Sequence, residues 1–377
     1  MKTTCIIKHI EDKSLAWFEP ENQYVVLEKI TGIVLEKIHK KTPLQAILKH
    51  LDKELDIPLD KAKAFVSDVQ QFYQKNTEAV PKEDAVGEEA IKPPGTFEYI
   101  KYYHINDLVV RVEYASKLEL ELVHLKFAHL ETTEKNTAAH TFSVFRKSQK
   151  IYLLVNNNFI GAWTAKDVHY FQGKFSMELV QVLYQKKEAE WLGVFHASAV
   201  GKNGKCMLFL GDSGNGKSTS LALLQAHGFE CVADDFVPVE AHYQHVYKFP
   251  AAISIKRNSF PVLLPYYPIL EMSEEFHLKQ LDKHVRYLPP VNQLSPTKMP
   301  CNGFVFIKYD AKAPFSCTQI PSVRAFEKIV PDSWLSPIAA NAATFLDWFS
   351  KQPCYELIYN DNSEMISEVH KLFDNNL

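Results

Sequence analysis

The sequence predicts an α/β fold preceded by a smaller α+β domain, and three features indicate this arrangement. An apolar stretch of strand length, 205–210, leads into a glycine-containing loop at 211–218. Leu221 and Leu224 then repeat at helical spacing, so the loop joins a strand to a helix. The polar stretch 76–95, which contains Pro and Gly, separates this region from the N-terminal part. At 377 residues, the chain is also too long for one ordinary hydrophobic core.

The N-terminal part, residues 1–75, is expected to be a compact domain, and residues 76–95 a linker that buries little apolar surface. Thr42 and Pro43 predict a helix start, with the proline at the first helical position. The apolar spacing predicts one strand and three helices, at 24–27, 30–39, 42–51 and 60–73.

Residues 96–190 are expected to form an α+β region that supports the domain after it. Alternating or continuous apolar runs predict strands at 108–112 and 151–155, and a helical pattern covers 175–186. Nothing in this region has a recognisable chemical signature. Residues 191–377 are expected to form one nucleotide-binding domain, which the C-terminal strands and helix complete.

Composition excludes several classes of protein. A formal net charge of −3 gives no basic surface for nucleic acid, so no nucleic-acid partner is expected. The six cysteines are scattered without metal-ligand spacing, which favours buried thiols over disulfides. The N-terminus lacks the apolar core of a signal peptide, and no apolar run is long enough to cross a bilayer. We therefore expect a cytoplasmic protein without a membrane partner.

The loop that follows the apolar strand matches the Gly-x4-Gly-Lys-Ser pattern of a phosphate-binding loop. Glycine is scarce, 13 of 377 residues, which makes a chance match rare. Backbone N–H groups of such a loop surround phosphate oxygens, Lys217 would reach the β- and γ-phosphates, and the Ser218 hydroxyl would ligate Mg²⁺. The predicted nucleotide-binding residues are Gly211, Asp212, Ser213, Gly214, Asn215, Gly216, Lys217, Ser218 and Thr219.

Polar residues flank this loop on both sides. His196 ends an apolar stretch, and a turn at 201–204 predicts a hairpin that leads into the loop. Downstream, Gly228 is in the C′ position, just after the end of a helix, and the next short strand ends in Asp234 and Asp235. Strand ends beside a phosphate loop are suitable places for Mg²⁺ ligands or a proton acceptor. Without the loop, this acidic pair would be read as a solvated strand end.

This block of residues, from His196 through the loop and Gly228 to the Asp234–Asp235 pair, resembles the HPr kinase/phosphorylase family and its serine-kinase-like relatives. The resemblance implies the phosphoenolpyruvate carboxykinase-like P-loop fold, the cofactors ATP and Mg²⁺, and a homo-oligomer. It implies that Asp234 is the general base and that His196 lies near the transferred phosphate. Asp235 and Ser218 would help to hold the metal.

The chain departs from HPr kinases proper in two respects. Residue 219 is Thr where those enzymes usually have Glu, and their downstream signature, with its glutamate metal ligand, is absent. The resemblance therefore implies neither HPr as the substrate nor the reverse phosphorylase activity. Lys256 and Arg286, in the stretches found instead, are candidates for binding phosphates or an acidic substrate, although basic residues on loops are usually solvated.

The N-terminal domain resembles the PqqD-like family, a small winged-helix-like module, through residues 18–27 and 30–34. Members of that family commonly capture a leader peptide along a sheet edge. A structural cap or a dimerisation module is the alternative.

Three hypotheses of function follow. The preferred one is an ATP- and Mg²⁺-dependent kinase that phosphorylates a hydroxyl, that of serine above all, on a peptide or small protein recruited by the N-terminal domain, as in the modification of ribosomally made peptides. The others are a nucleotide-responsive binding protein that transfers no phosphate, and a kinase of small molecules.

Overall fold

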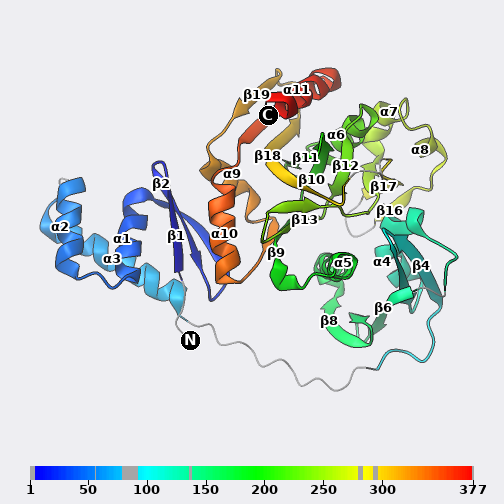
Figure 1. The fold of residues 1–377 in the computed structure, drawn as a ribbon, viewed down its shortest axis with the longest axis horizontal. Coiled ribbons are helices and arrows are strands. Elements are labelled where there is room, and N and C mark those ends of the chain that lie inside the picture. The colour runs from blue at the N-terminus through cyan, green and yellow to red at the C-terminus, as the bar shows by residue number, and fades with distance from the viewer. Residues whose placement is uncertain are drawn as a thin grey trace. The chain divides into compact units, whose positions relative to one another are not determined.

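The computed structural model describes residues 5–55, 57–78, 92–135, 138–278, 283–291 and 296–375. The chain forms two compact units, which are drawn in Figure 1. Unit 1 consists of Met1–Val86 and Ile320–Cys354, and unit 2 consists of Gly87–Gln319 and Tyr355–Leu377. Most of the predicted linker, residues 79–91, lies outside the described residues.

Unit 1 begins with an antiparallel sheet of order β1-β2-β3, which is followed by three helices. Leu15 to Phe18 of the central strand are all buried, and Ala16 and Phe18 lie in one hydrophobic cluster with residues of the three helices. Pro43 is the N-cap of the second helix, not its first residue, because its ψ of 140° is extended. The elements are β1 Cys5–Ile10, β2 Lys13–Phe18, β3 Gln23–Glu28, α1 Lys29–His39, α2 Leu44–Glu54 and α3 Leu59–Thr77. The predicted strand and helices are present, β1 and β2 are additional, and the PqqD-like assignment stays a prediction.

The second segment of unit 1, residues 320–354, packs against this N-terminal part. The Tyr24 ring makes edge contacts with Phe326 and Phe345 at centroid distances of 6.0 and 5.5 Å. Asn22 donates a hydrogen bond of 2.7 Å to the Leu335 carbonyl. The segment comprises α9 Ser322–Ile329, β20 Ser333–Leu335 and α10 Ala339–Phe349. The sequence-based boundaries placed this segment in the 191–377 domain, because contacts between residues 300 positions apart leave no local pattern.

Unit 2 starts with a five-stranded sheet of order β4-β5-β6-β7-β8, in which only the β5–β6 pair is parallel. Its longer helix, α5, packs on β7 and β8. The elements are β4 Tyr99–Ile105, β5 Leu108–Tyr114, α4 Lys117–Phe127, η1 Ala128–Leu130, β6 Ala138–Lys147, β7 Lys150–Val155, β8 Asn158–Thr164, η2 Ala165–Asp167, α5 Val168–Tyr184 and η3 Glu188–Glu190. This region supplies two helices, α4 and α5, to the cavity described below.

The largest sheet of unit 2 has the order β12-β10-β11-β18-β14-β13-β9, with β21 on β18 and β19 on β21. Strands β11 and β18 pair in parallel, whereas the β10–β11, β10–β12, β9–β13, β13–β14, β14–β18 and β19–β21 pairs are antiparallel. Its strands are β9 Trp191–Phe195, β10 Ser198–Lys202, β11 Lys205–Leu210, β12 Glu230–Asp234, β13 Val237–Glu240, β14 His245–Tyr247, β18 Lys298–Tyr309, β19 Ser316–Gln319 and β21 Cys354–Tyr359. The helices α6 Lys217–Ala226 and α11 Asn362–Asn375 pack on each other and with this sheet.

A small antiparallel sheet of order β15-β17-β16 completes unit 2. Its strands and the short helices near them are β15 Ile253–Lys256, η4 Arg257–Ser259, α7 Phe260–Leu263, α8 Ile269–Met272, β16 Phe276–Leu278 and β17 Lys283–Leu288.

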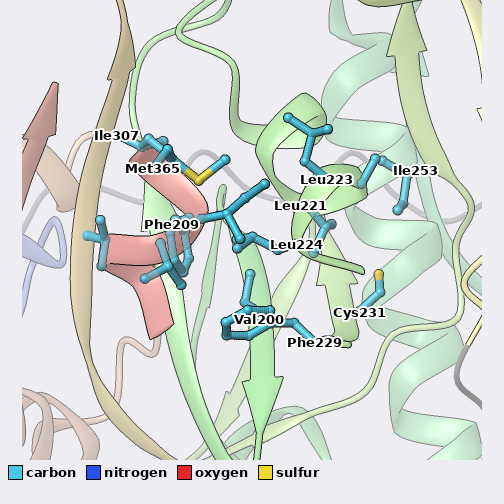
Figure 2. Close-up of a cluster of buried hydrophobic side chains, with 14 of the residues drawn as sticks. Val200, Phe209, Leu221, Leu223, Leu224, Phe229, Cys231, Ile253, Ile307 and Met365 are labelled. Atoms are coloured by element: carbon cyan, nitrogen blue, oxygen red, sulfur yellow. The ribbon is translucent and has the colours of Figure 1, made fainter. Parts of the chain in front are cut away.

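The core of unit 2 surrounds α6. Figure 2 shows Leu221, Leu223 and Leu224 of this helix in one cluster with Phe209 of β11 and Met365 of α11. These side chains are at most 1% exposed. Because the helix is buried on almost every side, its position relative to β11 is set by close packing, and the loop between the two elements is held at both ends.

Candidate active site

Three chain segments with polar side chains meet at one edge of the large sheet. Strands β11 and β12 both run antiparallel to β10, which lies between them, so their carboxyl ends reach the edge where β10 begins. Gly211 follows β11, Asp234 ends β12, and His196 precedes β10. The sheet order therefore brings together the glycine loop, the acidic pair and the histidine. The sequence analysis expected these three features to form one site.

The loop after β11 has a backbone that depends on its glycines. Gly211, Gly214 and Gly216 have φ values of 150°, 106° and 93°, which disfavour any other residue. A Cβ at Gly211 would lie 2.6 Å from the Ile307 carbonyl oxygen. The Tyr309 N–H donates to the Asn215 carbonyl at 3.1 Å and thereby ties the loop to β18. The loop is thus fixed next to the N-terminus of α6. The backbone N–H groups at a helix N-terminus have no partner within the helix and favour the binding of an anion.

Lys217 and Ser218 begin the helix. Lys217 is 7% exposed, and its Nζ donates a hydrogen bond to the Gly211 carbonyl across the loop. The residue after Ser218 is Thr219, and its Oγ1 lies 2.7 Å from Ser259 Oγ. Thr219 therefore joins the helix to η4.

Asp234 is the buried member of the acidic pair, at 3% exposure. Its carboxylate accepts hydrogen bonds from Ser198 Oγ at 2.6 Å, Ser218 Oγ at 3.3 Å and the Ser254 N–H at 3.4 Å. Burial, and after it the neighbouring charge of Asp235, raise the pKa of Asp234 to about 7, although the two serine hydroxyls oppose the shift.

Asp235 has a left-handed backbone, with φ of 63°, and its side chain turns to a different partner. Its Oδ2 lies 3.6 Å from Nζ of Lys126 in α4. Burial opposes the charge of Asp235, but the charges of Lys126, His196 and Lys217 outweigh it and lower the pKa of this carboxyl. The two adjacent aspartates therefore have pKa values shifted in opposite directions.

His196 is exposed at the same edge. Its Nδ1 lies 3.3 Å from the carbonyl oxygen of Asp235, so a proton on Nδ1 would be donated to the backbone. That arrangement leaves Nε2 as the nitrogen that can meet a ligand.

These groups line a cavity of about 430 Å³ in unit 2. The predicted residues that line it are His196, Asp212, Ser213, Gly214, Gly216, Lys217, Ser218, Thr219, Asp234, Asp235 and Lys256. Gly211 and Asn215 shape the loop but do not line the cavity. Lys256 Nζ lies 3.3 Å from Ser213 Oγ, beside the loop, where a cation would meet a phosphate.

Arg286 does not belong to the cavity. Its guanidinium donates hydrogen bonds to the Leu270 and Glu271 carbonyls and lies 4.5 Å above the centre of the Phe260 ring. Val285 and Tyr287 line the cavity, and because side chains alternate along a strand, the residue between them points the other way. Arg286 thus stabilises the short helix α8.

The sequence did not reveal three residues of the site. Ser198 is two positions after His196 and directly opposite Asp234 in the β10–β12 register, a relation that depends on strand pairing. Ser254 reaches Asp234 from β15. Lys126 comes from α4, over 100 positions before Asp235, and a lone lysine near the end of a helix has no distinguishing local signal.

The donor set is compatible with a nucleotide-bound Mg²⁺. No group of three or more His, Cys, Asp or Glu side chains among the described residues could hold a metal by itself. Magnesium at phosphate sites usually takes one or two carboxylates, the nucleotide phosphates and water, which does not require such a group. Ser218 with the Asp234–Asp235 pair beside the open glycine loop supplies the protein's share of those oxygens.

Comparison with known proteins leaves the family of this chain open. No family model and no curated protein matches the sequence. Among solved structures, the Hpr(Ser) kinase/phosphatase from Coxiella burnetii is similar over 48% of this chain and 94% of that chain, at 10% identity and a TM-score of 0.23. At so low a score the similarity does not establish a shared fold. Of the helices in the described ranges, none is both long and apolar enough to cross a membrane.

Proposed function

We propose that the protein is an ATP- and Mg²⁺-dependent kinase that phosphorylates a hydroxyl, in particular that of a serine, on a peptide or small protein. The observation that supports this most is the position of Asp234. A carboxylate with its pKa raised to about 7 faces the same cavity as the glycine loop. That combination joins a phosphate-binding site to a group able to take a proton near neutral pH.

The triphosphate would be bound by the loop N–H groups, the N-terminus of α6 and Lys217. Lys217 donates to the Gly211 carbonyl in this structure, and with nucleotide bound it would donate to the β- and γ-phosphates. Lys256, beside Ser213, adds a second cation. Ser218 and Asp235 would hold the magnesium ion, which when bound neutralises charge on the phosphates.

The pKa shifts of the acidic pair divide its roles. Asp235 stays ionised, which suits a metal ligand, whereas Asp234 is poised to accept a proton. In the transfer step the acceptor oxygen bonds to the γ-phosphorus, the bond to the β–γ bridging oxygen breaks, ADP leaves, and Asp234 takes the hydroxyl proton. As the imidazolium, with a proton on each ring nitrogen, His196 would donate from Nε2 to the transferred group.

Labelled ATP with a library of serine-containing peptides tests the transfer. We expect D234N to lose about 10²- to 10⁴-fold in transfer rate while it still binds Mg·ATP. D235N should instead raise the Mg²⁺ concentration needed for half-maximal rate. An Asp234 variant as active as the parent would exclude this residue as the base. If D234N instead raised the Mg²⁺ requirement and D235N lowered the transfer rate, Asp234 would be the metal ligand and Asp235 the base.

The N-terminal part of unit 1 would recruit the peptide substrate, as the PqqD resemblance implies. Removing residues 1–75 is a poor test, because it would uncover Phe326 and Phe345, which pack on Tyr24. Shortening the substrate avoids this problem. A peptide that lacks its leader segment should have a raised KM and an unchanged kcat, and equal KM values would contradict recruitment.

A further inference from the structure

The cavity has a second wall, which the phosphate loop does not form. Helix α4 lines it with Leu122, Leu125 and Lys126, and helix α5 lines it with Gln172 and Gly173. Both helices belong to the region for which the sequence predicted only a supporting role. The wall is therefore part of the site, although no motif marks it.

This wall is held in a fixed position. Gln172 Nε2 donates to the Leu122 carbonyl at 2.8 Å, which joins α5 to α4. The Ala252 N–H donates to the Lys126 carbonyl at 2.8 Å and fixes the end of α4. Phe127, at the base of the wall, meets Phe249 edge to face at 5.8 Å. The surface is thus preformed, as binding sites for small groups usually are.

The acidic pair connects the two walls. Asp234 contacts Ser218 on the loop side, and Asp235 contacts Lys126 on the side of α4. A group bound against α4 and α5 would therefore lie across the acidic pair from the nucleotide phosphates. An acceptor hydroxyl requires this position, because it must approach the phosphorus and Asp234 together.

Gly173 lies in the interior of α5 and is exposed to the cavity. Glycine is less favourable than alanine inside a helix, and the backbone here does not have the positive φ that would require it. Outside the helix and the flanking residues, no described atom lies within 4 Å of the position that a Cβ would take. Packing within the chain therefore does not account for the missing side chain, whereas a ligand at this place would.

We infer that the α4–α5 wall is the acceptor subsite and that Gly173 sets the size of the group that carries the hydroxyl. The inference rests on the proposed kinase function. The wall fits a short, serine-like hydroxyl side chain, because Gly173 leaves room and Lys126 and the acidic pair are polar. The half-buried Leu122 and Leu125 fit an apolar residue next to that hydroxyl in the acceptor.

The test compares the parent, G173A and G173F in the full-length protein. The acceptors are nine-residue peptides with a central serine and randomised neighbours. We expect G173F to lose roughly 10- to 200-fold in kcat/KM for transfer, since it fills the subsite, and G173A to lose less. Calorimetric affinity for Mg·ATP and the thermal unfolding midpoint are measured in parallel. Tyr170→Trp, which enlarges a 62% exposed side chain on the same helix outside the cavity, is the matched control.

The inference is supported if G173F binds Mg·ATP and unfolds like the parent but loses transfer, and if the preferred peptides have apolar residues next to serine. It is overturned if G173F transfers as fast as the parent, or if Tyr170→Trp causes an equal loss. A parent protein that transfers phosphate to none of the peptides would overturn the proposed kinase function itself.

Discussion

Replacing Asp234 by asparagine is expected to stabilise the protein at high pH while it removes phosphoryl transfer. The reason is that the site holds a carboxylate in a buried place next to a second carboxylate. Asparagine has nearly the same shape and can keep an acceptor oxygen toward Ser198, but it carries no charge. The variant therefore allows the effect of the carboxylate charge on the free energy of unfolding to be measured separately from its effect on the rate of transfer.

The magnitude follows from the shift of the pKa from 3.8 to about 7. Between these values the folded protein keeps a proton on Asp234 that the unfolded chain releases, so stability falls as pH rises from about 4 to about 7. At about 1.36 kcal/mol per pKa unit, the penalty is on the order of 4 kcal/mol above pH 7 and roughly 2 kcal/mol at pH 5. The advantage of D234N over the parent should thus grow by about 2–3 kcal/mol between pH 5 and pH 8.

Urea denaturation of both proteins at the two pH values, followed by circular dichroism, measures this difference. Titrations of other groups largely cancel in the comparison of parent and variant. D332N, which removes an exposed carboxylate, is the control. An advantage of the same size at both pH values would mean that Asp234 does not titrate between them. The reasoning that makes it the proton acceptor would then be refuted.

Three further predictions concern the loop, the second wall and the core. K126M should lower the transfer rate about tenfold, because it removes the cation 3.6 Å from Asp235. K126R keeps a cation there and should retain most of the parent rate. Initial rates at saturating ATP test both variants. G211A should abolish calorimetric binding of Mg·ATP, since its Cβ would meet the Ile307 carbonyl at 2.6 Å, and unchanged affinity would contradict the loop geometry. L224A should cost about 2–5 kcal/mol in the free energy of unfolding, measured in urea, because Leu224 is fully buried in the core around α6; a loss under about 1 kcal/mol would show that the core closes over the gap.

Local features of the site were predictable from the sequence. The strand before the loop was predicted at 205–210 and has these limits, and the leucines whose spacing predicted a helix after the loop, Leu221 and Leu224, lie in α6. Gly228, the residue after the C-cap His227 of α6, has the left-handed φ of 87° that is typical of this position. These features depend on neighbours within a few positions, such as apolar spacing and the conformational range of glycine, which the linear sequence contains.

The partners of the acidic pair were not predictable in the same way. Asp234 was proposed as base and Asp235 as metal ligand with Ser218, but nothing in the sequence separates two adjacent aspartates. The register of β10 with β12 brings Ser198 to Asp234, and the left-handed turn at Asp235 directs its side chain to Lys126. The opposite pKa shifts of the two carboxyls result from these contacts.

The sequence by itself determined the glycine loop, its strand and helix, and the acidic pair, since each is defined by residues close together in the chain. Only the tertiary structure decided that α4 and α5 line the cavity, that Arg286 points away from it, and that residues 320–354 pack with the N-terminal unit. These contacts join segments that can be more than 300 positions apart. They are selected by packing and strand register in the whole fold, and so they leave no periodic trace in any single stretch of sequence.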